Sequence, residues 1–396
     1  MTSPSASGGF RLRTLAATVY LPTILFAVGE GAASSVIALA ALDLGASPAQ
    51  AGVIVGLRGL GRLLFDVPAG VLIARFGEKR SMVATGVALA AIGGALWVTQ
   101  SLWVFGSLVT LMGCAWGLWQ IGRLAFATSV SAVEHRGRVM STIGGATRIG
   151  LFVGPALASL IIPGFGLNGA FLVLAGLSAV AAFSVALAPA SHLVREEAAH
   201  QKATLVEVVR DHRRTLLTAG SLAVIAQILR SSREVLLPLW ATKIGVEGAT
   251  IPLIFTASYL VESAVFYPVG LLMDRKGRKW AFTPFIALLA LGLALIPIAS
   301  TLAALTAIAM VIGLANGLGS GMNMTLASDL SPIDGRSRFL GVWRLISDVG
   351  AVGGPLLIAA VTSAATLSVA AVSMGGVGAV GLVILWRLVP ETLPSG

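Results

Sequence analysis

Twelve ionisable residues lie inside long apolar stretches of the sequence, where charged side chains are rare. They are Glu30, Arg58, Arg62, Asp66, Arg123, Arg148, Arg230, Arg233, Glu234, Glu262, Arg344 and Asp348. An ionisable group in hydrocarbon costs about 2.5 to 3.5 kcal/mol on insertion scales, so each side chain requires an ion partner or a watery cavity. Their chemistry is therefore that of buried ion pairs and of carboxylates that can take up a proton.

The apolar stretches recur along nearly the whole chain of 396 residues. The sequence is 56% hydrophobic and only 11% charged, which is typical of a membrane protein. Runs of about 18 to 27 apolar residues can each cross a hydrocarbon core of about 30 Å, and they lack the alternation of barrel strands. We predict an all-α protein with twelve membrane-spanning helices, at 16–42, 49–74, 81–99, 103–128, 137–162, 167–188, 215–242, 248–273, 279–300, 302–328, 336–362 and 366–386.

Most of the 27 Lys and Arg residues fall in the termini and in the loops on one side of these spans. Positive residues concentrate in cytoplasmic loops, so both termini are predicted to be cytoplasmic. This topology explains the net charge of +10 and leaves no surplus that would indicate a nucleic acid partner. With Cys114 alone and four scattered histidines, we predict no disulfide framework, metal site or cofactor.

The sequence resembles itself when it is shifted by 200 residues. The matched positions include Gly70 with Gly270, Gly77 with Gly277, Lys79 with Lys279, Gly150 with Gly350, Gly154 with Gly354 and Pro155 with Pro355. An offset of six spans returns the chain to the same side, so the repeats are parallel and related by an axis along the membrane normal. We predict an N-terminal six-helix bundle at 1–188, a cytoplasmic linker at 189–214 with a short amphipathic helix at 203–214, and a C-terminal six-helix bundle at 215–396.

The loop between the eighth and ninth predicted spans carries a specific motif. It reads Gly270-x-x-x-Asp274-Arg275-x-Gly277-Arg278-Lys279 and resembles the signature loop of the major facilitator superfamily. Gly277 permits a turn with positive φ, the basic residues hold the loop inside, and Asp274 can meet the positive end of a helix as a latch. The resemblance covers essentially the whole chain.

The first copy of this loop keeps most of the motif. It retains Gly70, Arg75, Gly77 and Lys79 but has Ala74 where the aspartate belongs. We therefore expect a latch in the second copy only. An alternative is that both loops only set the topology.

The fifth span carries Gly150-x-x-x-Gly154-Pro155, which is similar to the signature of drug/proton antiporters in that superfamily. The spacing of four puts both glycines on one helix face for close packing, and the proline permits a kink. Ala158 and Ser159 replace the two glycines that normally end the pattern. The motif favours export, although packing glycines in any transporter would look similar.

Three of the charged positions recur 200 residues apart with inverted sign. These are Glu30 with Arg230, Arg62 with Glu262, and Arg148 with Asp348. The family architecture packs span 2 beside span 11 and span 5 beside span 8, and a rise of about 1.5 Å per residue gives matching depths of roughly 16–18 Å for the residues of each pair. We therefore predict ion pairs Arg62–Asp348 and Arg148–Glu262 between the halves. An internal Arg62–Asp66 bridge is the competing prediction.

Glu30 and Arg230 sit deeper, on spans that line the cavity in this family. With Arg233 and Glu234 one turn on, they are expected to form a cluster toward the outer half. Protonation of a carboxylate would weaken such a pair, so Glu30 first, then Glu262 and Asp348, are the proton-carrier candidates. Permanent ion pairs that only hold helices together are the alternative.

Trp119 and Arg123 on the fourth span and Asn316 on the tenth are candidate substrate contacts, although a tryptophan there is also typical of packing. No ATP-binding loop is present, so transport would draw on a gradient. The resemblance implies a monomeric, non-enzymatic transporter of the bacterial inner membrane. We expect proton-coupled export of small amphipathic molecules; uptake or exchange of an organic anion through the arginines, and a non-transporting sensor or lipid-binding protein, are the alternatives.

Overall fold

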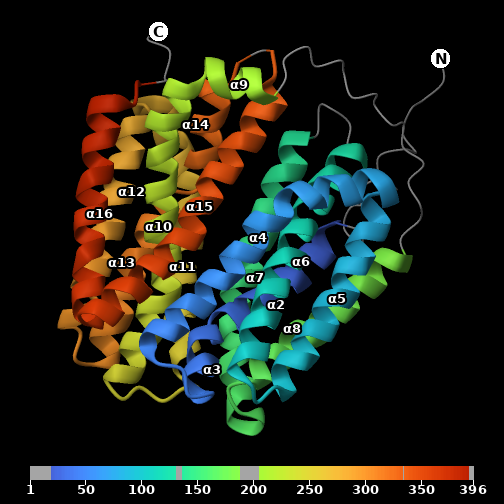
Figure 1. Ribbon diagram of the computed structural model, residues 1–396, viewed down its shortest axis with the longest axis vertical. Helices are drawn as coiled ribbons and strands as arrows, with labels where there is room; N and C mark the ends of the chain where they lie inside the picture. Colours follow the sequence, from blue (N-terminus) through green and yellow to red (C-terminus); the bar gives the residue numbers. More distant parts are fainter. Residues whose placement is uncertain (1–18, 131–135, 188–204, 333, 392–396) are drawn as a thin grey trace.

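The computed structural model describes residues 19–130, 136–187, 205–332 and 334–391. In these ranges the chain is almost entirely helical (Figure 1). The first helices are α2 (Leu21–Ser34), α3 (Ile37–Asp43), α4 (Pro48–Phe76), α5 (Glu78–Val98), α6 (Leu102–Val130), α7 (Arg136–Phe165) and α8 (Gly169–Leu187). The later ones are α9 (Leu205–Asp211), α10 (Arg213–Lys243), α11 (Ile251–Lys276), α12 (Arg278–Leu295) with the 3₁₀ turn η3 (Ile296–Ile298), α13 (Leu302–Leu318), α14 (Met322–Leu330), α15 (Arg336–Ala364) and α16 (Leu367–Leu388).

Ten segments of the described chain are long and apolar enough to span a membrane. The two predicted spans that do not meet this criterion are α4 and α11. Helix α4 is 29 residues long but carries Arg58, Arg62 and Asp66 inside it, and the side chains of α11 are described only as far as Val265. The protein is therefore a multi-pass membrane protein, while a count of twelve spans stays a prediction.

Two predicted spans are each divided into two helices. The first breaks at Ser35–Val36, where the hydroxyls of Ser34 and Ser35 bond back to the carbonyls of Gly31 and Ala32. The tenth breaks at Gly319–Gly321, and Gly321 has a φ of 77° that favours glycine. Both breaks come from local backbone chemistry that a pattern of apolar residues does not report.

The helix ends follow capping rules. The side chain of Ser47 accepts a hydrogen bond from the backbone of Gln50, whose own side chain bonds back, so α4 begins with a capping box. The same helix ends at Gly77 with a φ of 84°, and α11 ends before Gly277 with a φ of 96°. The positive φ predicted for Gly277 is confirmed, and Gly77 shares it.

The early helices lie on one side of the molecule and the later ones on the other (Figure 1). We refer to α2–α8 as the N-terminal group and to α10–α16 as the C-terminal group. Between the groups, α4 packs on α15 and α7 packs on α11. This neighbour relation was expected of spans 2 and 11 and of spans 5 and 8, and it is confirmed.

The groups lean together at the α3 end of the molecule (Figure 1). At this end, a Cβ added to Gly52 or Gly59 would lie 3.2 or 3.0 Å from atoms of α15, and the hydroxyl of Ser159 donates to the carbonyl of Ala249 at 2.6 Å. The short helix α9 lies at the opposite end and falls within the segment predicted to be an amphipathic helix, with Val208 buried and Val206 73% exposed. The rest of that linker, 189–204, lies outside the described residues.

The glycines of the Gly-Pro motif lie at a close contact between helices, as predicted. A Cβ at Gly150 or Gly154 would lie 2.4 or 2.3 Å from atoms of α2. In the second copy, a Cβ at Gly350 or Gly354 would lie 2.3 or 2.2 Å from atoms of α10. Pro155 lies within α7. The repeated sequence therefore makes the same kind of close helix contact twice.

Candidate functional site

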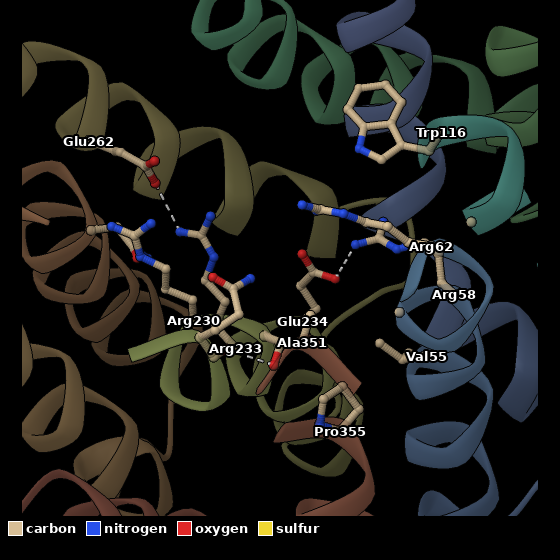
Figure 2. A pocket seen from close by; sticks show the side chains of 15 residues that line it. Val55, Arg58, Arg62, Trp116, Arg230, Arg233, Glu234, Glu262, Ala351 and Pro355 are labelled. Carbon is tan, nitrogen blue, oxygen red and sulfur yellow. Dashed lines mark hydrogen bonds and ion pairs between the residues drawn. The ribbon is translucent and has the colours of Figure 1, made fainter. Parts of the chain in front are cut away.

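A cavity of about 200 Å³ lies between the two helix groups, against α4, α6, α10, α11, α13 and α15 (Figure 2). Six charged side chains line it: Arg58, Arg62, Arg230, Arg233, Glu234 and Glu262. Val55, Trp116 and Pro355 add apolar surface. Ligand sites commonly enclose about 300–1,000 Å³. The cavity therefore offers charged and apolar contacts to a small molecule, and a larger one requires the groups to move apart.

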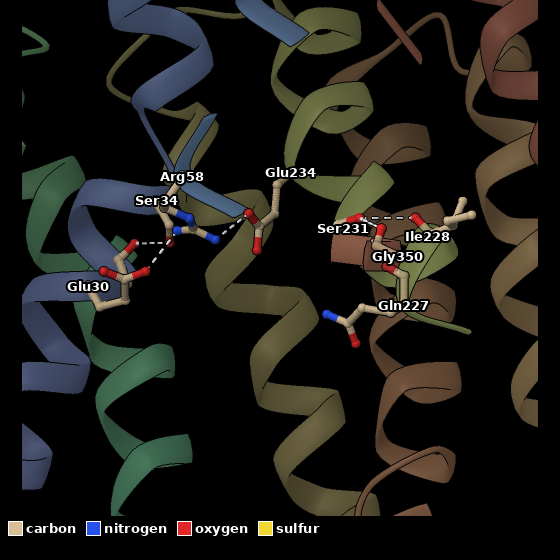
Figure 3. A network of polar contacts seen from close by, with 9 residues as sticks. Glu30, Ser34, Arg58, Gln227, Ile228, Ser231, Glu234 and Gly350 are labelled. Atoms are coloured by element: carbon tan, nitrogen blue, oxygen red, sulfur yellow. Dashed lines mark hydrogen bonds and ion pairs between the residues drawn. The ribbon is translucent and has the colours of Figure 1, made fainter. Parts of the chain in front are cut away.

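Arg58 joins two carboxylates from different helix groups (Figure 3). Its Nη1 donates to Glu30 on α2 at 2.8 Å, and its Nη2 donates to Glu234 on α10 at 2.6 Å. The Glu30 side chain is 7% exposed, and its Oε2 has no hydrogen-bond partner in the described part of the chain. We call Glu30, Arg58 and Glu234 the acid–arginine cluster. With both acids ionised its formal charge is −1, and one proton would neutralise it.

Glu30 and Arg230 were expected to share a cluster with Arg233 and Glu234, but Glu30 is joined to Glu234 through Arg58 and not to Arg230. Arg230 instead donates to the carbonyl of Gly319 at 2.6 Å and lies over the ring of Phe285, 4.9 Å from its centroid. Gly319 permits this contact, because a Cβ there would lie 2.6 Å from the guanidinium. Arg58 was recognised as a buried charge but not as part of the site. Its depth of about 24 Å from the inner end of its span, at 1.5 Å per residue, matches that of Glu30 and would have indicated the pair.

Two further ion pairs cross between α4 and α15. Arg62 donates to Asp348 at 3.0 Å, which confirms that predicted contact. Asp66 was predicted as a competing partner of Arg62, but it accepts from Arg344 at 3.2 Å instead. Arg344 also lies 3.7 Å from Asp348. Asp66 and Arg344 share a depth of about 12 Å by the same helical rise, so depth matching would have found this pair too.

The predicted pair Arg148–Glu262 gives way to a closer partner. Glu262 accepts from Arg233 at 3.0 Å, and the guanidinium of Arg233 lies 4.7 Å from the ring centroid of Tyr259, one turn earlier on α11. The charges of Arg148 and Arg230 also act on Glu262. The position of a residue in the sequence gives its height along a helix, but not the direction in which its side chain points.

The three candidate substrate contacts divide by position. Trp119 is fully buried and stacks on Phe26 at 3.7 Å, so it belongs to the core. Arg123 is 8% exposed and is held by Gln120 and Thr147, away from the cavity. Both were candidate substrate contacts, and neither is among the residues that line this cavity. Asn316 does line the cavity, is 3% exposed, and finds no acceptor for its side-chain Nδ2 among the described residues.

The signature loop is described in part. The guanidinium of Arg278 pairs with Asp329 at 2.9 Å. The carboxylate of Glu391 accepts from the backbone N–H groups of Arg278 and Lys279 at 2.9 and 3.1 Å, which satisfies donors at the start of α12. In the first copy, Arg75 lies over Phe76 at 5.4 Å, and the space beside Gly70 is open. The side chains of Asp274 and Arg275 and the packing at Gly270 lie outside the described residues, so the latch stays a prediction.

Comparison with known proteins places these features in a family. The sequence model of the Major Facilitator Superfamily matches residues 19–232 and, in a second match, 219–396. The chain is 24% identical to "Multidrug resistance protein MdtH" of Klebsiella pneumoniae (strain 342) over 369 residues, 89% of each chain. It is 25% identical to "Inner membrane transport protein YajR" of Escherichia coli (strain K12) over 228 residues, and this match spans 57% of the chain and only 49% of that relative.

Solved transporters share the arrangement of helices. A POT family transporter in complex with a thioalcohol-conjugated peptide matches with a TM-score of 0.77 at 12% identity, covering 94% of this chain and 95% of that one. A D-xylose-proton symporter matches with a TM-score of 0.72 at 16% identity, covering 97% and 98%. A point mutant of the nucleoside transporter NupG also gives 0.72, at 14% identity, covering 93% and 99%. At these identities the likeness concerns the fold alone.

Proposed function

The chain belongs to the major facilitator superfamily and is a membrane transporter, and from this premise we propose that it exports small amphipathic organic molecules in exchange for protons. The observation that carries the proposal is the acid–arginine cluster. Arg58 holds Glu30 of one helix group and Glu234 of the other at 2.8 and 2.6 Å, beside the cavity. A proton on either acid removes a charge from this bridge.

The proposal includes the layout predicted from the sequence. Twelve spans form two parallel six-helix bundles, 1–188 and 215–396, which rock about the cavity, and both termini face the cytoplasm. The name of the relative YajR supports an inner membrane location, and the name of the relative MdtH supports export of organic compounds. We expect the protein to act as a monomer.

Coupling follows from the position of the cluster between the groups. Separation of α2 and α4 from α10 would break the contact between Arg58 and Glu234 and leave a carboxylate without its cation. Removing one partner of a buried ion pair costs about 3–5 kcal/mol. A proton on Glu234 would offset this cost, because Arg58 keeps Glu30 as its partner, so protonation of Glu234 favours the movement.

The test is proton flux in proteoliposomes that contain the purified full-length chain. A pH-sensitive dye inside reports proton movement when a panel of amphipathic anions and cations is added. Substrate-driven flux is expected in the wild type and in Glu247→Gln, which changes an exposed loop acid, and is expected to be lost in Glu30→Gln and Glu234→Gln. Equal flux in all four proteins would refute proton coupling through this cluster.

Uptake or exchange of an organic anion is the second candidate function. It is favoured by Arg230, which lines the cavity with no carboxylate partner among the described residues. Transport of an anion with no proton movement in the same vesicles, unchanged in Glu30→Gln, would support this candidate over proton-coupled export.

A further inference from the structure

The cavity lining carries more positive than negative charge. Four arginines line it, Arg58, Arg62, Arg230 and Arg233, against the two carboxylates of Glu234 and Glu262. Arg58 forms an ion pair with Glu234, Arg62 with Asp348 and Arg233 with Glu262. Figure 2 shows Arg230 and Trp116 on opposite sides of the cavity. In the described part of the chain, Arg230 is thus the cavity arginine without an ion pair, and a molecule in the cavity meets an excess of positive charge.

Two buried hydrogen-bond donors on α10 and α13 have no acceptor within the described chain. They are Nε of Arg230 and Nδ2 of Asn316, and both side chains line the cavity. Asn316 is 3% exposed. A buried donor without an acceptor is costly, and one near a binding site is commonly satisfied by ligand or water. Both unsatisfied groups are donors, so a ligand group that satisfies them must be an acceptor.

We propose that Arg230 and Asn316 form a subsite for an oxyanion, such as a carboxylate or sulfonate, on the transported molecule. Charge and hydrogen bonding select the same group, because an oxyanion accepts from both donors and complements the guanidinium. Trp116, Val55 and Pro355 contact the apolar part. The substrate is thus an amphipathic organic anion. This inference rests on the proposed transport function and names its substrate class.

The subsite also explains why Arg230 is positioned without a carboxylate. Its Nη2 is held by the carbonyl of Gly319 and its face rests on Phe285, so the guanidinium is oriented without neutralisation of its charge. Arg123 is a useful contrast, because among the described residues it too has no carboxylate partner, yet it is held by Gln120 and Thr147 outside the cavity. Removing Arg123 deletes a buried charge and leaves the subsite intact.

The test is calorimetric binding to full-length protein in phosphatidylcholine nanodiscs, with 2-naphthoate and its uncharged analogue 2-naphthamide as probes. The wild type is expected to bind the acid at least about tenfold more tightly than the amide, the effect of one charged hydrogen-bonded contact. In Arg230→Gln this ratio is expected to fall to about one, with Arg230→Lys and Asn316→Ala intermediate and Arg123→Gln unchanged.

Several results would overturn the subsite. One is equal affinity of the wild type for 2-naphthoate and 2-naphthamide, which includes no binding of either. Another is an Arg230→Gln variant that keeps the full ratio of the two affinities. If Arg230→Gln does not yield folded protein, the affinity ratios of the wild type and of Arg230→Lys decide whether the subsite exists. Phosphatidylglycerol in the nanodisc is expected to leave the affinity for 2-naphthoate unchanged; competition would assign the subsite to a lipid headgroup and overturn its role in transport. Proton movement is not read in this assay, so failure of proton coupling and failure of the subsite are distinguished.

Discussion

The ion pair between Arg62 and Asp348 gives a quantitative prediction about how the two helix groups are coupled. The atoms Nη2 and Oδ1 are 3.0 Å apart, and the side chains are 29% and 4% exposed. At this distance two unit charges attract by about 1.4 kcal/mol in bulk water and by about 5.5 kcal/mol at an effective dielectric constant of 20. Because Arg62 keeps partial access to the cavity, we expect a coupling energy of about 2–3 kcal/mol, between these limits.

A double-mutant cycle of Arg62→Gln and Asp348→Asn measures this coupling. The free energy of unfolding would be followed by circular dichroism as dodecyl sulfate is added to protein in mixed micelles. Asp348→Asn is expected to destabilise more than Arg62→Gln, because Asp348 also lies 3.7 Å from Arg344 and the aspartate therefore serves two arginines. The double mutant is expected to be less destabilised than the sum of the single mutants.

The chain contains a matched control at the same distance. Arg210 and Asp211 are also 3.0 Å apart, but their side chains are 70% and 57% exposed. Water and salt screen such a pair, so its cycle is expected to show no measurable coupling. If the coupling of Arg62 with Asp348 were no larger than that of the control, the argument that this contact holds α4 to α15 would fail.

Two further predictions concern packing around the cavity. Gly113→Ala should lower the free energy of unfolding by about 1–3 kcal/mol, because the added Cβ would lie 2.0 Å from a backbone oxygen of α4. Gly145 has open space beside it, so Gly145→Ala should be nearly neutral in the same unfolding assay. Trp116→Ala should weaken the binding of 2-naphthoate, while Trp119→Phe should lower stability and leave that affinity unchanged, because only Trp116 lines the cavity; a loss of affinity in both variants would contradict the placement of Trp119 in the core.

The sequence predicts the helices and the matching heights of Arg62 and Asp348 on them. Apolar runs and an offset of 200 residues are one-dimensional patterns, and a helix converts residue number into depth at about 1.5 Å per residue. The contact of Arg62 with Asp348 follows from that conversion and from the family's packing order. The break at Ser35–Val36 does not, because it depends on hydroxyls that bond to local carbonyls.

The sequence could not predict in the same way which of several charged residues at equal depth form an ion pair. Arg233 rather than Arg148 binds Glu262, and this choice depends on the rotation of α10 and on the Tyr259 ring beside the guanidinium of Arg233. The burial of Trp119 against Phe26 likewise depends on which face of α6 meets α2. Both contacts depend on how a helix is rotated about its axis, and matching depths do not determine that rotation.

The placement of the ion pairs also bears on the proposed coupling of substrate to protons. Arg58–Glu234, Arg62–Asp348 and Asp66–Arg344 all join one helix group to the other. If the groups separate at this depth, each of these contacts is lost, and a loss without compensation costs about 3–5 kcal/mol, more than thermal motion supplies.

The exposed arginines have water from the opening cavity to replace their partners, since Arg62 and Arg344 are already 29% and 33% exposed. The carboxylates of Asp66 and Asp348 are 5% and 4% exposed and lack that compensation, but they can remain paired with an arginine on their own helix. The arginines nearest to Glu234 on α10 are already engaged, because Arg230 is held by the carbonyl of Gly319 and Arg233 is bound to Glu262. We therefore expect the acid–arginine cluster, rather than the α4–α15 pairs, to be where movement of the groups requires a proton.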